Sequence, residues 1–184
     1  MRASGILLPV FSLPSEGRIG NFSDDAKRFI DFLAESGQKY WQILPLGPEG
    51  KGNSPYQPVS CFAGSLCYLD PKQLYEQGWI TEQEYVQYEG RQKQTYTADY
   101  AGVRAELTPL LHKAYFRFKN QPPEKQDEFQ SFCREQAFWL DDYALFTVIA
   151  EEYPEKTWRQ WPDPLRFREP EALQEQTDNN REQI

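Results

Sequence analysis

One stretch of this sequence, Tyr40 to Gln57, limits what the chain can fold into more than any other. The mostly apolar run Tyr40–Leu46 is typical of a buried strand. It stops at a loop rich in glycine, proline, asparagine and serine, and Tyr56 and Gln57 follow directly. Strands that end in a rigid polar loop commonly carry the binding groups of α/β enzymes. We therefore expect an α/β fold with ligand contacts in this loop.

The residues before this stretch support an α/β start. A short apolar run, Gly5–Val10, indicates a first strand or extended segment. Ser23 is typical of a helix N-cap, apolar residues then recur at helical spacing, and Gly37 is typical of the residue after a helix. A helix between two buried strands, with short connections, is the order of elements in α/β proteins.

After Asp70 the sequence is nearly all helical. An N-cap followed by proline at Asp70–Pro71, and a capping box at Thr81–Glu84, predict two helix starts. Two long apolar stripes follow, Tyr100–Phe118 and Phe129–Val148. Pro109 lies inside the first stripe, so either a new helix begins there or one helix is kinked. We expect the aromatic rings of the second stripe to be core residues rather than a binding platform.

The bulk composition excludes several classes of partner. The formal net charge is −8, and no basic cluster is present. Such a surface repels phosphate backbones and anionic membranes, so neither nucleic acid nor a membrane is an expected partner. No apolar run is long enough to span a bilayer, and Pro9 interrupts the N-terminal apolar stretch without a following cleavage site. We expect a cytoplasmic protein.

Few residues could form a metal or nucleophilic site. The single histidine, His112, rules out a two-histidine metal site built from this chain alone. His112 lies on a charged stretch of a predicted helix, which favours a solvent-facing side chain. Three cysteines without close pairs, Cys61, Cys67 and Cys133, are expected to be reduced thiols packed as small apolar groups.

Several segments carry a resemblance to one known family. They are RASGILLP at Arg2–Pro9, YWQILPLGP at Tyr40–Pro48, GNSPYQ at Gly52–Gln57, FWLDDYALF at Phe138–Phe146, and later pieces at Trp158–Trp161 and Pro164–Arg168. Together they resemble the N-terminal third of amylomaltase, the 4-alpha-glucanotransferase also called disproportionating enzyme. The resemblance implies part of a (β/α)₈ TIM barrel in residues 1–70 and a large, mostly helical insertion subdomain in residues 71–184.

The resemblance also implies an activity. The family cleaves an α-1,4-glucosidic bond and passes the glucan segment to another glucan by a retaining mechanism, in starch, glycogen and maltodextrin metabolism, without a metal or organic cofactor. Malto-oligosaccharides are the implied partners. A complete barrel needs roughly 250 residues, and this chain has 184. We therefore expect the remainder of the same enzyme to complete the barrel. The family's catalytic carboxylates lie on later strands, so no catalytic residue is expected here and the chain alone should be inactive.

Two pairs of acidic residues within the chain, Asp24–Asp25 and Asp141–Asp142, do not fit the catalytic role. Retaining chemistry needs two facing carboxyl groups about 5–5.5 Å apart. Sequence neighbours on a helix point in different directions. Helix-start charges on a solvated face explain both pairs.

The resemblance assigns glucan contacts to the loop. Ser54 and Tyr56 match family positions that contact glucan near the cleavage point, and Asn53 and Gln57 flank them in the motif. An aromatic ring can cover the C–H face of a sugar while hydroxyl and amide groups bond to its rim. The alternative is structural, with Tyr56 plugging the top of the barrel and Ser54 capping a turn.

The resemblance also raises the question of a second glucan-binding groove, which some family members have. Lys51 stands where many relatives have an aromatic residue, and Tyr100 is the candidate for the aromatic partner in that groove. Three hypotheses for the whole chain stay open: part of a glucanotransferase, a non-catalytic module that binds malto-oligosaccharides, or an inactive remnant. A remnant would associate with itself through an exposed strand edge.

Overall fold

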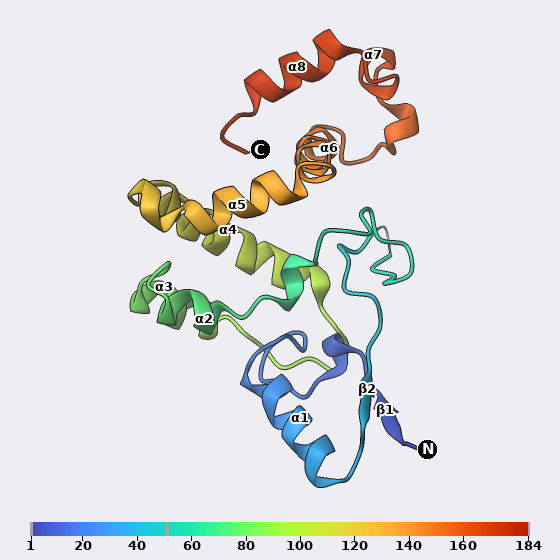
Figure 1. Cartoon of the computed structure of the whole chain (residues 1–184), viewed down its shortest axis with the longest axis vertical. Helices are drawn as coiled ribbons and strands as arrows, with labels where there is room; N and C mark the ends of the chain where they lie inside the picture. The colour runs from blue at the N-terminus through green and yellow to red at the C-terminus, as the bar shows by residue number, and fades with distance from the viewer. Residues whose placement is uncertain (1, 51, 184) are drawn as a thin grey trace. The chain divides into compact units, whose positions relative to one another are not determined.

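The computed structural model describes residues 2–50 and 52–183 and separates into two compact units, residues 1–126 and 127–184. Helices predominate, and the described residues contain one sheet of two strands (Figure 1). An α/β start followed by a helical remainder is therefore confirmed. The predicted boundary at residue 70 concerns the complete barrel and stays a prediction.

The sheet joins the two apolar runs near the N-terminus. β1 (Gly5–Leu7) pairs in parallel with β2 (Tyr40–Gln42), with Ile6 opposite Trp41. The predicted extended runs were longer, but regular pairing covers three residues of each strand. The 3₁₀ helix η1 (Val10–Ser12) follows the first run, and the second continues into an irregular loop. The indole N–H of Trp41 also donates to the Leu8 carbonyl, at 2.8 Å.

The helix between the strands begins and ends as its sequence predicts. α1 spans Asp24–Glu35, and the Ser23 hydroxyl accepts a hydrogen bond from the Asp25 N–H. The helix ends just before Gly37. Ala26 and Leu33 are its buried residues.

Two short helices follow, each with the predicted cap. α2 spans Pro71–Glu76, and the Asp70 carboxylate accepts from the Lys72 N–H at 3.0 Å. The 3₁₀ helix η2 (Leu66–Tyr68) precedes it. α3 spans Glu82–Glu89, with the complete capping box between Thr81 and Glu84. α2 packs against α3.

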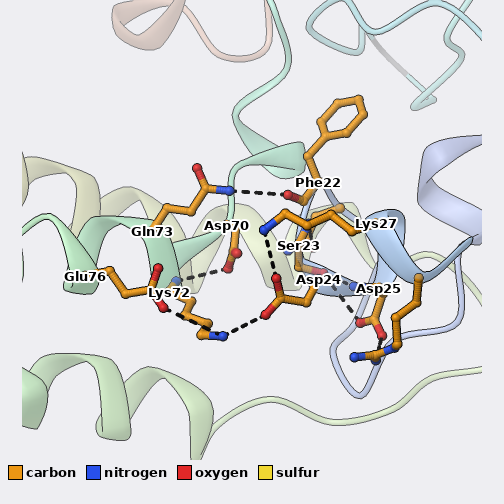
Figure 2. Close-up of polar contacts among 11 residues, drawn as sticks. Phe22, Ser23, Asp24, Asp25, Lys27, Asp70, Lys72, Gln73 and Glu76 are labelled. Atoms are coloured by element: carbon orange, nitrogen blue, oxygen red, sulfur yellow. Dashed lines mark hydrogen bonds and ion pairs between the residues drawn. The ribbon is translucent and has the colours of Figure 1, made fainter. Parts of the chain in front are cut away.

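An ion-pair cluster ties the start of α1 to α2 (Figure 2). Asp24 accepts from Lys72 of α2 at 2.7 Å and from Lys27 at 2.9 Å. Asp25, beside it, is paired with Arg28. The hydrogen bonds from Lys27 and Lys72, in that order of size, lower the pKa of Asp24 to about 2. Asp24 therefore connects the two helices, while Asp25 forms an ion pair within α1.

Replacing Lys72 by alanine should raise the pKa of Asp24 part of the way from about 2 toward its ordinary 3.8, because Lys27 remains as the larger cause. A lowered carboxyl pKa stabilises the folded state above about pH 3.8 and loses that contribution as the pH falls toward 2. The variant should therefore show a smaller loss of stability over that range. A ¹³C NMR titration of the Asp24 carboxyl measures the shift, with Lys27→Ala as the matched variant. An unchanged pKa in Lys72→Ala would contradict the pairing.

The core of the first unit is built around one long helix. α4 spans Tyr100–Lys119 with Pro109 inside it, so the stripe is a single helix rather than two. Its buried face packs with residues from the N-terminal loops and η2, and includes Val103, Leu107, Leu110 and Ala114. This packing is apolar and continuous on both sides of the proline, so it offsets the backbone hydrogen bond that proline cannot make. The 3₁₀ helix η3 (Pro123–Lys125) follows α4, and His112 is exposed on α4 as predicted.

The second unit corrects the prediction for the aromatic stripe. The stripe is divided between α5 (Asp127–Gln136) and α6 (Leu140–Glu152). Phe132 and Phe138 are exposed, so the expectation that its rings form a core is wrong for these side chains. The core of this unit instead joins Ile149 of α6 to Trp161 and Leu165. The 3₁₀ helix η4 (Trp158–Gln160), α7 (Asp163–Arg166) and α8 (Pro170–Asn179) complete the unit.

Neither a membrane span nor a metal cluster is found in the described part of the chain. None of its helices is both long and apolar enough to cross a bilayer. No group of three or more histidine, cysteine, aspartate or glutamate side chains there could hold a metal ion.

Candidate functional site

The loop after β2 is closed by its own backbone. The Val59 N–H donates to the Pro48 carbonyl at 3.2 Å, and the Ser65 N–H donates to the Leu46 carbonyl at 2.8 Å. These two bonds join the two arms of the loop, the outgoing arm that contains Leu46 and Pro48 and the returning arm that contains Val59 and Ser65. At the tip, the Asn53 N–H donates to the Gly50 carbonyl at 3.0 Å. The loop is therefore a folded structure with two arms and a turn.

Two glycines and an asparagine stand where this backbone requires them. A Cβ on Gly50 would lie 2.5 Å from the Gln57 carbonyl oxygen, so the two arms are in backbone contact there. Gly52 has φ of 89° and Asn53 has φ of 55°. This left-handed region costs glycine nothing and tolerates asparagine better than most residues. Most substitutions at Gly50, Gly52 or Asn53 would therefore disturb the tip of the loop.

The predicted glucan contacts Ser54, Tyr56 and Gln57 follow this turn. Tyr56 is 70% exposed, so its ring is not part of the core of this chain. The Ser54 hydroxyl oxygen accepts from the Tyr56 N–H at 3.4 Å and therefore does cap a turn. The Gln57 N–H donates to the Ser54 carbonyl at 3.3 Å, while the Gln57 side chain is exposed. Asn53 is half-buried and engaged elsewhere, as described below.

The second glucan groove stays a prediction, and the structure describes one of its two candidate positions. Lys51 lies outside the described residues. Tyr100 is only 5% exposed, its ring packs edge-on against Phe11, and its hydroxyl lies 3.2 Å from the Tyr68 hydroxyl. Burial raises the pKa of Tyr100 above its ordinary value. The glucan role of Tyr100 stays a prediction, and its place in this structure is within the core.

The structure adds a group that sequence reasoning missed. Arg104 of α4 donates to the Asn53 side-chain oxygen at 2.9 Å, and its other terminal nitrogen lies 3.4 Å from Glu49 Oε2. The Ser65 hydroxyl donates to the same Glu49 oxygen at 2.9 Å. Arg104 lies 51 residues after Asn53 and 55 after Glu49, and no periodicity connects them. The one signal in the sequence was Glu49, an acidic residue among glycines, which could have indicated that the loop has a charged partner.

The acidic pairs noted in the sequence lie outside the loop. Asp24 and Asp25 line a polar cavity of about 440 Å³ together with Asp70 and Glu89. Burial raises the pKa of both Asp70 and Glu89. None of the predicted glucan contacts lines this cavity. In the second unit Asp142 pairs with Arg168 at 2.7 Å.

The loop can bind but has little means of proton transfer. Glu49 is the single carboxyl group between residues 43 and 64, and it is already bonded to Ser65 and Arg104. What the loop exposes is an aromatic ring beside hydroxyl and amide groups. That combination suits a neutral ligand with apolar faces and a polar rim.

Comparison with known proteins gives a consistent result. The family described as 4-alpha-glucanotransferase matches residues 8–184. The 4-alpha-glucanotransferase of Thermus thermophilus is 40% identical over 175 residues, covering 95% of this chain and 34% of that protein. The one from Synechocystis sp. is 41% identical over 176 residues, covering 94% and 34%.

A solved structure is also similar. The amylomaltase from Streptococcus agalactiae, in complex with acarbose, matches with a TM-score of 0.88 and 34% sequence identity, over 100% of this chain and 37% of that chain. The chain thus spans about a third of the length of the relatives it matches.

Proposed function

This chain belongs to the 4-alpha-glucanotransferase family, and from that premise we propose that it forms the N-terminal part of an enzyme that transfers α-1,4-glucan segments between malto-oligosaccharides. The loop after β2 supplies glucan contacts. The catalytic carboxylates of the retaining reaction are supplied by the remainder of the enzyme, outside this chain. The reaction needs no cofactor and belongs to cytoplasmic maltodextrin, starch or glycogen metabolism.

One observation carries the binding role, namely the exposed Tyr56 ring on a loop with a closed backbone. The ring can stack on the face of a glucose unit, while Ser54 and Gln57 bond to its hydroxyl groups. Because the loop is already folded, little conformational entropy is lost when sugar binds. Asn53 contributes by holding the turn.

The sheet supports the proposal of an incomplete barrel. Ile6 and Leu7 of β1 and Tyr40 of β2 are exposed large side chains on a sheet of two strands. A (β/α)₈ barrel covers such strands with neighbours on both edges and side chains within. We propose that residues 1–70 contribute the first barrel strands and that residues 71–184 form the helical insertion.

Calorimetric titration of the chain with maltoheptaose tests the binding role. We expect heat at millimolar maltoheptaose and none with cellohexaose, a glucan of similar composition with β-1,4 bonds. Absence of heat with maltoheptaose would reject glucan binding by this chain.

Incubation with maltotriose tests where the catalytic groups lie. The chain alone should release no glucose, because Asp24, Asp25 and Asp142 are engaged in ion pairs and the loop has no second carboxyl group. Glucose release by the purified chain would show that the catalytic carboxylates are present here after all.

A further inference from the structure

The glycine turn of the loop is held on both of its sides by one side chain from α4. Glu49 precedes the turn and Asn53 follows it. The guanidinium group of Arg104 contacts both, at 3.4 Å from Glu49 Oε2 and 2.9 Å from Asn53 Oδ1. A planar guanidinium can make two such contacts at once because its donors have a fixed fork geometry. Arg104 therefore bridges the two ends of the turn.

Glu49 makes this bridge more than a surface contact. Its side chain is only 3% exposed. Oε2 accepts from Ser65 and pairs with Arg104, while Oε1 is buried and has no hydrogen-bond partner among the described residues. Leaving a buried carboxylate without its cation is costly. Loss of Arg104 should therefore displace Glu49, and the turn that follows it.

Arg104 is itself fixed by the core. It follows Tyr100 by one turn of α4, and its guanidinium carbon lies 5.9 Å from the centre of the Tyr100 ring, a favourable cation–π distance. The Tyr100 ring is buried, with its hydroxyl against that of Tyr68. The core therefore fixes Tyr100, Tyr100 helps to fix Arg104, and Arg104 fixes Asn53. Ser54 is the next residue along the chain.

We propose that Arg104 is a positioning residue, which sets the conformation of the loop so that Ser54 and Tyr56 meet glucan in one arrangement. Arg104 acts through Glu49 and Asn53 and does not contact the sugar. The effect of Arg104 on glucan binding rests on the proposed function, whereas its effect on the conformation of the loop does not.

Amide hydrogen exchange, followed by NMR on the full chain, tests the effect on the loop. In Arg104→Ala the amides of Asn53 and Val59, whose acceptors lie across the turn and the arms, should exchange at least tenfold faster. Amides of Leu107 and Ala114 within α4 should keep their rates, because alanine is a good helix former and Arg104 is partly exposed. Unchanged rates at Asn53 and Val59 would overturn the proposal.

Two further variants show whether the fork geometry matters. Arg91→Ala is the matched control, because it removes another arginine–glutamate pair that involves α4, the 2.9 Å contact between Arg91, just after α3, and Glu106 of α4, without touching the loop. It should leave the loop amides unchanged. Arg104→Lys keeps the charge but loses the fork, so its loop amides should exchange at intermediate rates. Wild-type exchange rates in the lysine variant would contradict the claim that the loop needs the fork geometry of arginine.

Maltoheptaose titration of the same variants then separates this proposal from the proposed function. If the wild-type chain binds, Arg104→Ala should bind about tenfold more weakly, and equal affinity would overturn the role of Arg104 in presenting the sugar contacts. If the wild-type chain gives no heat, glucan binding by this chain is rejected, while the exchange rates still decide whether Arg104 holds the loop.

Discussion

Tyr56→Ala is expected to weaken maltoheptaose binding about tenfold or more, with a change of less than about 1 kcal/mol in the free energy of unfolding. The ring is 70% exposed in this chain, so its removal leaves no cavity in the core. A stacked aromatic face is a large part of what the loop offers to a sugar, and tenfold corresponds to about 1.4 kcal/mol. In the complete enzyme the same change should slow glucan transfer.

Calorimetry and urea denaturation measure the two effects of Tyr56→Ala separately. Tyr96→Ala is a suitable control, because Tyr96 is also an exposed loop tyrosine in the first unit but lies far along the chain from the motif. It should alter neither affinity nor stability. If Tyr56→Ala instead lowers stability strongly while the remaining folded protein binds normally, the ring has a structural role.

Features that depend on neighbouring residues could be predicted from the sequence. The N-caps Ser23 and Asp70 and the capping box at Thr81 all depend on a side chain bonding to the backbone two or three residues away. Such signals are complete within one turn of chain. The helix starts of α1, α2 and α3 were therefore predictable to the residue.

Features that depend on distant partners could not be predicted in the same way. The strand that was expected over Tyr40–Leu46 pairs only as far as Gln42, because the extent of a strand depends on which neighbour lies beside it. The stripe Phe129–Val148 keeps helical spacing across the break between α5 and α6, so periodicity alone could not show that break.

The candidate site also contains both kinds of feature, those that depend on neighbouring residues and those that depend on distant ones. The motif predicts Ser54 and Tyr56 as contacts, because the residues that shape the turn lie next to them. It did not locate Arg104, whose contacts with Glu49 and Asn53 exist only after α4 has packed under the loop. The placement of Tyr100 in the core is likewise a consequence of packing, since an isolated tyrosine in sequence is compatible with either role.

That dependence of the site on α4 makes Leu107→Ala the most damaging single truncation expected in the first unit. Leu107 is 1% exposed and lies in the middle of the buried face of α4. Replacing such a leucine by alanine removes apolar contact and leaves a cavity, at a cost of about 2–5 kcal/mol. Since domains of this size have only about 5–15 kcal/mol of stability, a large share would be lost.

Urea denaturation followed through the amide NMR signals of α4 measures the loss on the first unit alone. Leu66→Ala is the matched control, because Leu66 is a largely exposed leucine of η2 and its truncation should cost less than about 1 kcal/mol. Equal costs for the two variants would mean that the buried face of α4 is not what stabilises this unit. If Leu107→Ala is destabilised as expected, maltoheptaose binding by the fraction still folded should be nearly normal, because Leu107 supports α4 as a whole and its apolar side chain can make no hydrogen bond or ion pair with the loop. That outcome would distinguish stability of the helix from the positioning role assigned to Arg104 on the same helix.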